Sequence, residues 1–146
     1  MTKTEILQAL PYSDPFLFVD ELLHIDENSV VGTFLYRKGF DFYRGHFKNF
    51  AITPAVILTE TMAQIGLACL GIFLQPQDIH RSVAMTNNTI DFLKPVFPEE
   101  KVTVYSEKIY FRFNKLNCRV RMENQLGEVI AKGTIAGMII NRPDEQ

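Results

Sequence analysis

The sequence lacks tryptophan, has only two cysteines and carries almost no excess charge. Its 15 Lys and Arg residues nearly balance 17 Asp and Glu residues, which gives a formal net charge of −2. A chain so close to neutral has no general attraction for polyphosphate, so nucleic acid is not expected as its main partner. The hydrophobic fraction, 47% of 146 residues, is too high for a disordered chain and indicates a single globular domain over residues 1–146.

The two cysteines, Cys69 and Cys118, have no CxxC pair or Cys/His cluster around them, so a metal site is not expected. Two buried free thiols in a reducing compartment are the simpler interpretation. The N-terminus lacks the pattern of a signal peptide. The longest apolar run, Ile65–Leu74, has ten residues, whereas a membrane span needs about 20. We therefore expect a soluble, cytoplasmic protein with no membrane span.

The order of the expected elements favours an α+β fold. Thr2 and Glu5 have the spacing of a capping box and begin a short helix that Pro11 ends. Apolar, β-branched and alternating segments predict strands before and after one long helix. These strands are Phe16–Ile25, Val30–Tyr36, Ser82–Asp91 with a break at Asn87-Asn88, Lys101–Phe113, Leu116–Met122 and Val129–Ile140. Strands grouped in this way indicate an antiparallel sheet rather than alternating βαβ units.

The long helix is apolar nearly all round. We expect Thr53 as its N-cap, Pro54 at its first position and an end near Leu74. In a soluble protein, such a helix must be wrapped by a sheet or by a partner subunit. Gly66 and Gly71 lie inside it and each costs about 1 kcal/mol relative to alanine. Close packing would compensate for them, and poor helix design is the other interpretation.

Glu60 is the only charged residue between Lys48 and Asp78. It lies in the second turn of the apolar helix, where loss of hydration would raise its pKa. Gln64 is four residues further on, so it shares a helix face with Glu60 and could orient the carboxylate. Such a carboxylate usually has a partner or a task, but a solvent edge or a structural hydrogen bond explains it equally well.

His46, followed by Phe47, lies in an irregular segment just before the helix. Alone it would be taken for a surface or capping histidine. Paired with Glu60 it suggests a base and an acid for one elimination, because both groups can exchange protons near neutral pH. The free N–H groups of Ala55 and Val56 at the helix N-terminus are placed to hold negative charge on a thioester oxygen.

Three stretches follow one another at fixed spacing, namely Gly45-His46-Phe47, Pro54-Ala55-Val56 and Glu60-Thr61-Met62-Ala63-Gln64. They are similar to the pattern GHFPGxPxxPGVxxxEaMAQ, the active-site segment of the 3-hydroxyacyl-acyl-carrier-protein dehydratases of type II fatty-acid synthesis. Leu10-Pro11, Pro15-Phe16-Leu17-Phe18-Val19-Asp20 and Phe92-Leu93-Lys94-Pro95-Val96 extend the resemblance over nearly the whole chain.

The resemblance implies a hotdog fold, in which an antiparallel sheet wraps around one long helix. It implies dehydration of (3R)-3-hydroxyacyl thioesters on acyl carrier protein to trans-2-enoyl thioesters. His46 would remove the α-proton and Glu60 would protonate the departing hydroxyl. In this family the two groups come from different subunits, so a homodimer or an assembly of dimers is implied. No metal, nucleotide or other cofactor is expected, because the elimination uses proton transfers alone.

The resemblance also assigns the residues around the two proton carriers. The Ala55 amide would hold the thioester carbonyl, with Val56 beside it and Phe47 as a further substrate contact. Gln64 would steady the acid. The chain departs from the family pattern at Lys48-Asn49, which replace Pro-Gly, and at Ala55 itself, which replaces a glycine that allows close approach of the backbone. We therefore expect a diverged member, serving a polyketide-like, polyene or pigment lipid pathway.

Four basic residues, Arg112, Lys115, Arg119 and Arg121, cluster around a predicted turn and the strand after it. Arg119 and Arg121 share one strand face, opposite the apolar residues. They form either an ordinary solvated face or a patch that docks the acidic acyl carrier protein and its phosphopantetheine arm.

Two other functions stay open. A hotdog thioesterase would use Glu60 to activate water, although such hydrolases generally lack the segment around His46. A non-catalytic, acyl-binding relative of the dehydratases would account for Lys48-Asn49 and Ala55, but it would have no need of both proton carriers.

Overall fold

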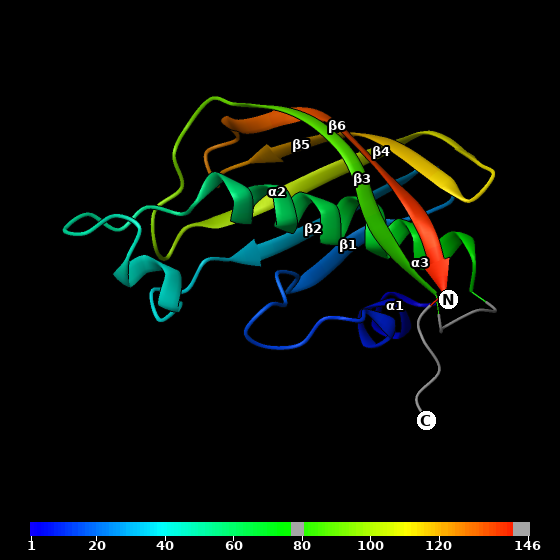
Figure 1. The fold of residues 1–146 in the computed structure, drawn as a ribbon, viewed down its shortest axis with the longest axis horizontal. Coiled ribbons are helices and arrows are strands. Elements are labelled where there is room, and N and C mark those ends of the chain that lie inside the picture. Colours follow the sequence, from blue (N-terminus) through cyan, green and yellow to red (C-terminus); the bar gives the residue numbers. More distant parts are fainter. Residues whose placement is uncertain (77–80, 142–146) are drawn as a thin grey trace.

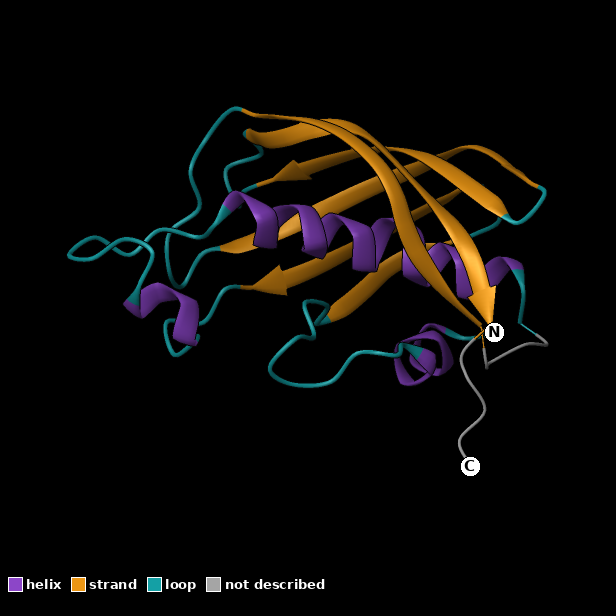
Figure 2. Cartoon of the chain, viewed as in Figure 1, coloured by secondary structure: helices purple, strands orange, loops and turns teal. Residues whose placement is uncertain are grey.

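The computed structural model describes residues 1–76 and 81–141. The expected α+β class is confirmed, because a six-stranded antiparallel sheet curves around one central helix (Figures 1 and 2). The sheet order is β1-β2-β4-β5-β6-β3. The strands are β1 Glu21–Ile25, β2 Ser29–Leu35, β3 Arg81–Phe92, β4 Lys101–Arg112, β5 Lys115–Glu123 and β6 Val129–Asn141. The helical elements are α1 Lys3–Ala9, η1 Asp41–Arg44, α2 Ala55–Ala63, η2 Gln64–Cys69 and α3 Leu70–Leu74.

The alternation predicted for β5 is confirmed. Its even-numbered residues from Leu116 to Met122 are buried against the central helix, whereas Arg119 and Arg121 are exposed on the outer face. The capping box of α1 is present too, since Glu5 N donates to Thr2 Oγ1 at 3.1 Å and Thr2 N donates to Glu5 Oε1 at 2.9 Å. Apolar periodicity and local capping thus explain most elements of the fold.

The central helix runs from Ala55 to Leu74 through α2, η2 and α3, and η2 is a π-helical turn. It is long and apolar enough to cross a membrane, yet 67% of its most apolar window is buried inside the protein, as in a core helix. A Cβ built on Gly66 would lie 3.1 Å from Ser106 Cβ, and one on Gly71 would lie 2.6 Å from Val83 Cγ2. Both glycines therefore allow close packing of the helix on the sheet. This packing, rather than poor helix design, explains their presence in the helix.

Two predicted boundaries are wrong. Pro54, not Thr53, is the N-cap of α2, because the Thr53 hydroxyl is hydrogen-bonded to Tyr43. The first strand begins at Glu21 rather than Phe16. The backbone of Phe16 and Phe18 is hydrogen-bonded to the side chain of Gln64 on the central helix, so this segment does not pair with the sheet.

Strand β3 lies at one edge of the sheet, where β6 is its neighbour. The break expected at Asn87-Asn88 is a β-bulge between Met85 and Asn87, and the strand continues beyond it to Phe92. Residues 85–89 are all exposed. Exposed edge strands of this length are natural sites for pairing with another chain.

Candidate active site

His46 is fixed by three hydrogen bonds that involve its backbone and its ring. Its N–H donates to Phe42 O at 3.0 Å, and Ile52 N–H donates to His46 O at 2.9 Å. The ring atom Nδ1 lies 2.8 Å from Ile52 O. A carbonyl oxygen can only accept, so Nδ1 carries the proton and Nε2 keeps a lone pair. The loop thus leaves Nε2 as the ring nitrogen that can accept a proton.

Phe47 follows His46 and begins a small projecting turn. Its backbone and that of Phe50 exchange hydrogen bonds of 2.6 and 3.1 Å, and both rings are exposed. The Phe47 ring stacks on the His46 imidazole, with the ring centres 4.0 Å apart. The position of Phe47 beside the base fits the substrate contact expected of it.

A cavity of about 350 Å³ opens beside His46. Its wall consists of His46, Phe47, Ile52, Thr53, Ala55, Leu58, Phe92, Leu93, Lys94 and Pro95. Ala55 is the first residue of α2, and the backbone bonds to Pro54 O begin with the amides of Ile57 and Leu58. The Ala55 and Val56 amides therefore precede the helical hydrogen-bond ladder, at the positive end of the helix dipole. The structure thus brings His46 and the Ala55 end of the helix together in the wall of one cavity.

Glu60 is half-buried on α2, and burial raises the pKa of its carboxyl group. Among the described residues, the wall of the His46 cavity does not include Glu60. Val56 lies one turn before Glu60 on the same helix face and is 74% exposed. Within a single chain, His46 and Glu60 therefore do not line the same cavity. The helix face that carries Glu60 is left partly uncovered.

Gln64 is fully buried, and both the oxygen and the nitrogen of its side-chain amide have partners other than Glu60. Its Oε1 accepts from Phe18 N–H at 2.8 Å, and its Nε2 donates to Phe16 O at 3.1 Å. These bonds anchor the N-terminal segment to the central helix. Gln64 thus has a structural role in the fold, and the expected role of steadying the acid stays a prediction. The signal was available in the sequence, because an amide in an all-buried helix must find partners.

Two tyrosine–threonine pairs escaped the sequence analysis. The Tyr36 hydroxyl lies 2.5 Å from Thr61 Oγ1, next to Glu60 in the chain, and the Tyr43 hydroxyl lies 2.5 Å from Thr53 Oγ1. Burial raises the pKa of both tyrosines, so both hydroxyls stay protonated and able to donate. No sequence pattern links residues so far apart, and only the fold shows these pairs.

The four basic residues lie at different places along β4 and β5. Arg112 and Lys115 are register partners next to the β4–β5 turn, at the end of the molecule opposite the start of α2 (Figure 1). Between them Phe113, with φ of 51°, is 93% exposed.

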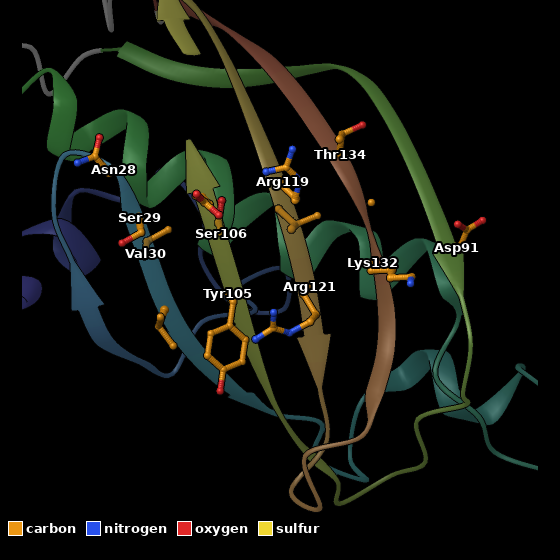
Figure 3. Close-up of a pocket in the computed structure, with 14 residues that line it drawn as sticks. Asn28, Ser29, Val30, Asp91, Tyr105, Ser106, Arg119, Arg121, Lys132 and Thr134 are labelled. Carbon is orange, nitrogen blue, oxygen red and sulfur yellow. The ribbon is translucent and has the colours of Figure 1, made fainter. Parts of the chain in front are cut away.

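Arg119 and Arg121 instead line an open groove of about 760 Å³ on the outer face of the sheet. Figure 3 shows Arg121 extending toward Tyr105, and its guanidinium lies 4.5 Å from the Tyr105 ring centre. Arg121 also donates to Glu123 at 2.6 Å, which offsets its charge. Arg112 and Lys115 are not among the residues that line this groove.

The family model and the relatives that this chain matches are all described as dehydratases. Residues 23–134 match the ApeI-like family, described as ApeI dehydratase. The 3-hydroxyacyl-[acyl-carrier-protein] dehydratase FabZ of Sinorhizobium fredii is 34% identical, with 96% of this chain and 90% of that protein covered. The FabZ of Rhizobium leguminosarum bv. trifolii is also 34% identical, over 94% of this chain and 88% of that protein.

Solved structures show the same fold at low identity. A hypothetical thioesterase with coenzyme A from Streptococcus pneumoniae has a TM-score of 0.62 and 14% identity, covering 85% of this chain and 88% of its own. The smu.793 protein from Streptococcus mutans, bound to acetyl CoA, has a TM-score of 0.64 and 16% identity, covering 92% and 98%. These likenesses confirm the hotdog fold and carry no conclusion about the reaction.

Proposed function

Because the chain belongs to the ApeI-like dehydratase family, we propose that it converts (3R)-3-hydroxyacyl thioesters on acyl carrier protein to trans-2-enoyl thioesters. The observation that carries this proposal is the geometry of His46. Its Nδ1 is tied to Ile52 O, and its Nε2 is free to accept a proton beside the Ala55 end of the helix. A thioester carbonyl at Ala55 would place the acidic α-carbon next to this base.

The reaction is an elimination of water. His46 Nε2 takes the α-proton, and the electron pair of that C–H bond forms the double bond between C2 and C3. The C3–O bond breaks as Glu60 gives its proton to the departing hydroxyl, and water leaves. Negative charge that develops on the thioester oxygen is held by the free amides of Ala55 and Val56. The raised pKa of Glu60 keeps more of it in the protonated form that this step needs.

The acid reaches the cavity from a second subunit in this proposal. Glu60 and Val56 lie on the uncovered face of α2, and β3 offers an unpaired, exposed edge. Pairing of two chains through β3 would cover that face and complete both sites. We therefore propose a homodimer, or an assembly of dimers, with His46 from one subunit and Glu60 from its partner.

The acyl carrier protein would dock at the β4–β5 turn. Arg112 and Lys115 supply positive charge for an acidic partner there, and Phe113 adds an exposed apolar contact. Arg121 is less suited, because Glu123 already offsets its charge. A cytoplasmic setting belongs to the same proposal, and the two free, buried thiols of Cys69 and Cys118 suit a reducing compartment.

A substrate series tests the proposed reaction. Carrier-bound 3-hydroxyacyl thioesters of increasing chain length, with aryl-conjugated members, are incubated with the purified protein, and enoyl absorbance and free thiol are both followed. Enoyl product is expected, and it should disappear in the variants His46→Ala and Glu60→Gln. Free thiol without enoyl product would identify a thioesterase. Tight binding of the carrier without turnover of any member would identify a non-catalytic subunit.

A further inference from the structure

A buried hydrogen bond joins the two ends of the loop that carries His46. The hydroxyl oxygens of Tyr43 and Thr53 lie 2.5 Å apart, and the two residues are only 6% and 4% exposed. Tyr43 belongs to η1, where the chain enters the loop, and Thr53 is the last residue before Pro54 at the start of α2. One side-chain contact therefore joins the two ends of residues 44–52.

The two residues that hold His46 are the immediate chain neighbours of this pair. Phe42, whose carbonyl accepts from His46 N–H, precedes Tyr43. Ile52, which bonds to both the backbone and the ring of His46, precedes Thr53. A shift of Tyr43 relative to Thr53 would therefore move the Phe42 carbonyl relative to the Ile52 carbonyl. His46 could then not keep both bonds at their present lengths.

Thr53 also connects the loop to the opposite wall of the cavity. Its N–H donates to Val96 O at 2.8 Å, and Val96 follows the cavity-lining residues Phe92–Pro95. The distance between the imidazole and that wall therefore depends on where Thr53 lies. The Thr53 hydroxyl is hydrogen-bonded to Tyr43 and does not cap α2. If Thr53 served only to begin the helix, its hydroxyl would be expected to bond to the first helical amides instead.

We propose that Tyr43 and Thr53 are positioning residues for His46: their hydrogen bond fixes the loop so that Nδ1 stays on Ile52 O and Nε2 faces the substrate. This inference rests on the proposed function, because it assigns to the pair the task of aiming the base. The task proposed for the two hydroxyls is to hold the loop, not to carry a proton.

Kinetics of Tyr43→Phe and Thr53→Val test the inference. Each variant removes one hydroxyl with little change of shape and leaves the other unpaired in the interior. We expect kcat to fall about 10- to 100-fold, since an ångström of misplacement costs about 100-fold, while KM stays within about twofold. Thr53→Ser keeps the oxygen and should restore kcat. The double variant should be no slower than the worse single one, because the two hydroxyls act through a single bond.

Ser106→Ala is the matched control. The Ser106 hydroxyl is equally buried and donates to Gly66 O at 3.1 Å, in the middle of the central helix and away from the loop. Its loss should lower the melting temperature and leave kcat unchanged. If Tyr43→Phe and Thr53→Val behave like Ser106→Ala, with lower stability and normal kcat, the pair is merely structural and the inference is overturned.

A measurement on the free protein separates this inference from the proposed function. Nuclear magnetic resonance of the ¹⁵N-labelled imidazole reports the protonated Nδ1 of His46 without any substrate. We expect that signal in the unaltered protein and in Thr53→Ser, and a mixture of tautomers in Tyr43→Phe and Thr53→Val. Unchanged Nδ1 signals in both would overturn the inference, even where no enoyl product is ever detected. Should Tyr43→Phe fail to fold, the two Thr53 variants decide alone.

Discussion

The Nδ1 atom of His46 lies 2.8 Å from the carbonyl oxygen of Ile52. Because that oxygen only accepts, the backbone itself selects the tautomer in which Nε2 is the free base.

The first prediction separates the base from the fold of its loop. In His46→Asn the side-chain amide can still donate to Ile52 O, whereas the basic nitrogen is lost. We expect kcat to fall by about 10²- to 10⁴-fold, the usual contribution of a positioned general base. Circular dichroism and gel filtration should show an unchanged fold and assembly. Activity within tenfold of the unaltered protein would contradict the role of His46.

The second prediction concerns the sharing of the site between subunits. His46→Ala and Glu60→Gln should each be inactive, but their mixture, after dissociation and reassociation, should regain about a quarter of normal activity. In a mixed dimer, one of the two sites receives an intact His46 from one chain and an intact Glu60 from the other.

Each variant taken alone through the same dissociation and reassociation is the control for this experiment. If both proton carriers act within one chain, every chain in the mixture has a defect, and no activity returns. The rise of activity with mixing therefore distinguishes the two arrangements directly.

The third prediction follows from the raised pKa of Glu60. Burial disfavours its charged form, so the folded state binds the proton more tightly than the unfolded state. The stabilisation that the Glu60 carboxyl group provides is fully present below pH 4.5, its ordinary pKa. This stabilisation is lost as the pH rises through the raised pKa of the folded state. At neutral pH, Glu60→Gln should therefore unfold at a higher temperature than the unaltered protein.

Thermal unfolding of both proteins over a series of pH values tests whether Glu60→Gln is the more stable one at neutral pH. The advantage of Glu60→Gln should shrink as the pH is lowered toward 4.5 and vanish below it, because the native carboxyl group is then neutral as well. Glu27→Gln, at an exposed turn position, should show no such pH-dependent difference. A Glu60→Gln variant that is less stable at neutral pH would show that the carboxylate has a charged partner instead.

The fourth prediction tests the docking surface. In the double variant Arg112→Glu and Lys115→Glu, we expect KM for a carrier-bound substrate to rise about tenfold or more, since two charges of the surface are reversed. Turnover of a short thioester without the carrier should not change. The same reversal at Arg119 and Arg121 is the control, and a stronger effect there would place the carrier on the outer face of the sheet.

Much of the fold could be predicted from the sequence because local patterns determine it. The alternation from Leu116 to Met122 and the apolar length of the central helix both have one simple structural solution. Residues near in sequence or bound by a repeated pattern are therefore predicted well.

Two of the failures involve hydrogen bonds to another segment of the chain. Thr53 has the sequence context of an N-cap, yet its hydroxyl is taken by Tyr43. Phe16 begins a segment with the composition of a strand, yet its carbonyl oxygen accepts a hydrogen bond from the Gln64 side chain. The π-helical turn η2 lies within an unbroken apolar run, where nothing marks a change of helix type. Tertiary hydrogen bonds override local preference at each of the first two positions.

The fifth prediction decides between the two roles of Gln64. Gln64→Leu leaves Phe18 N–H and Phe16 O without their partners. Because a buried group without a partner costs about 1–3 kcal/mol, the loss of two partners should lower the free energy of unfolding by about 2–6 kcal/mol. Denaturant unfolding measures this loss, and Gln8→Leu, at an exposed position of α1, should change it little. If Gln64 acts only through these two bonds, kcat per folded molecule stays within about threefold of normal. A much larger fall in kcat, with the N-terminal segment still in place, would return Gln64 to the role of steadying Glu60.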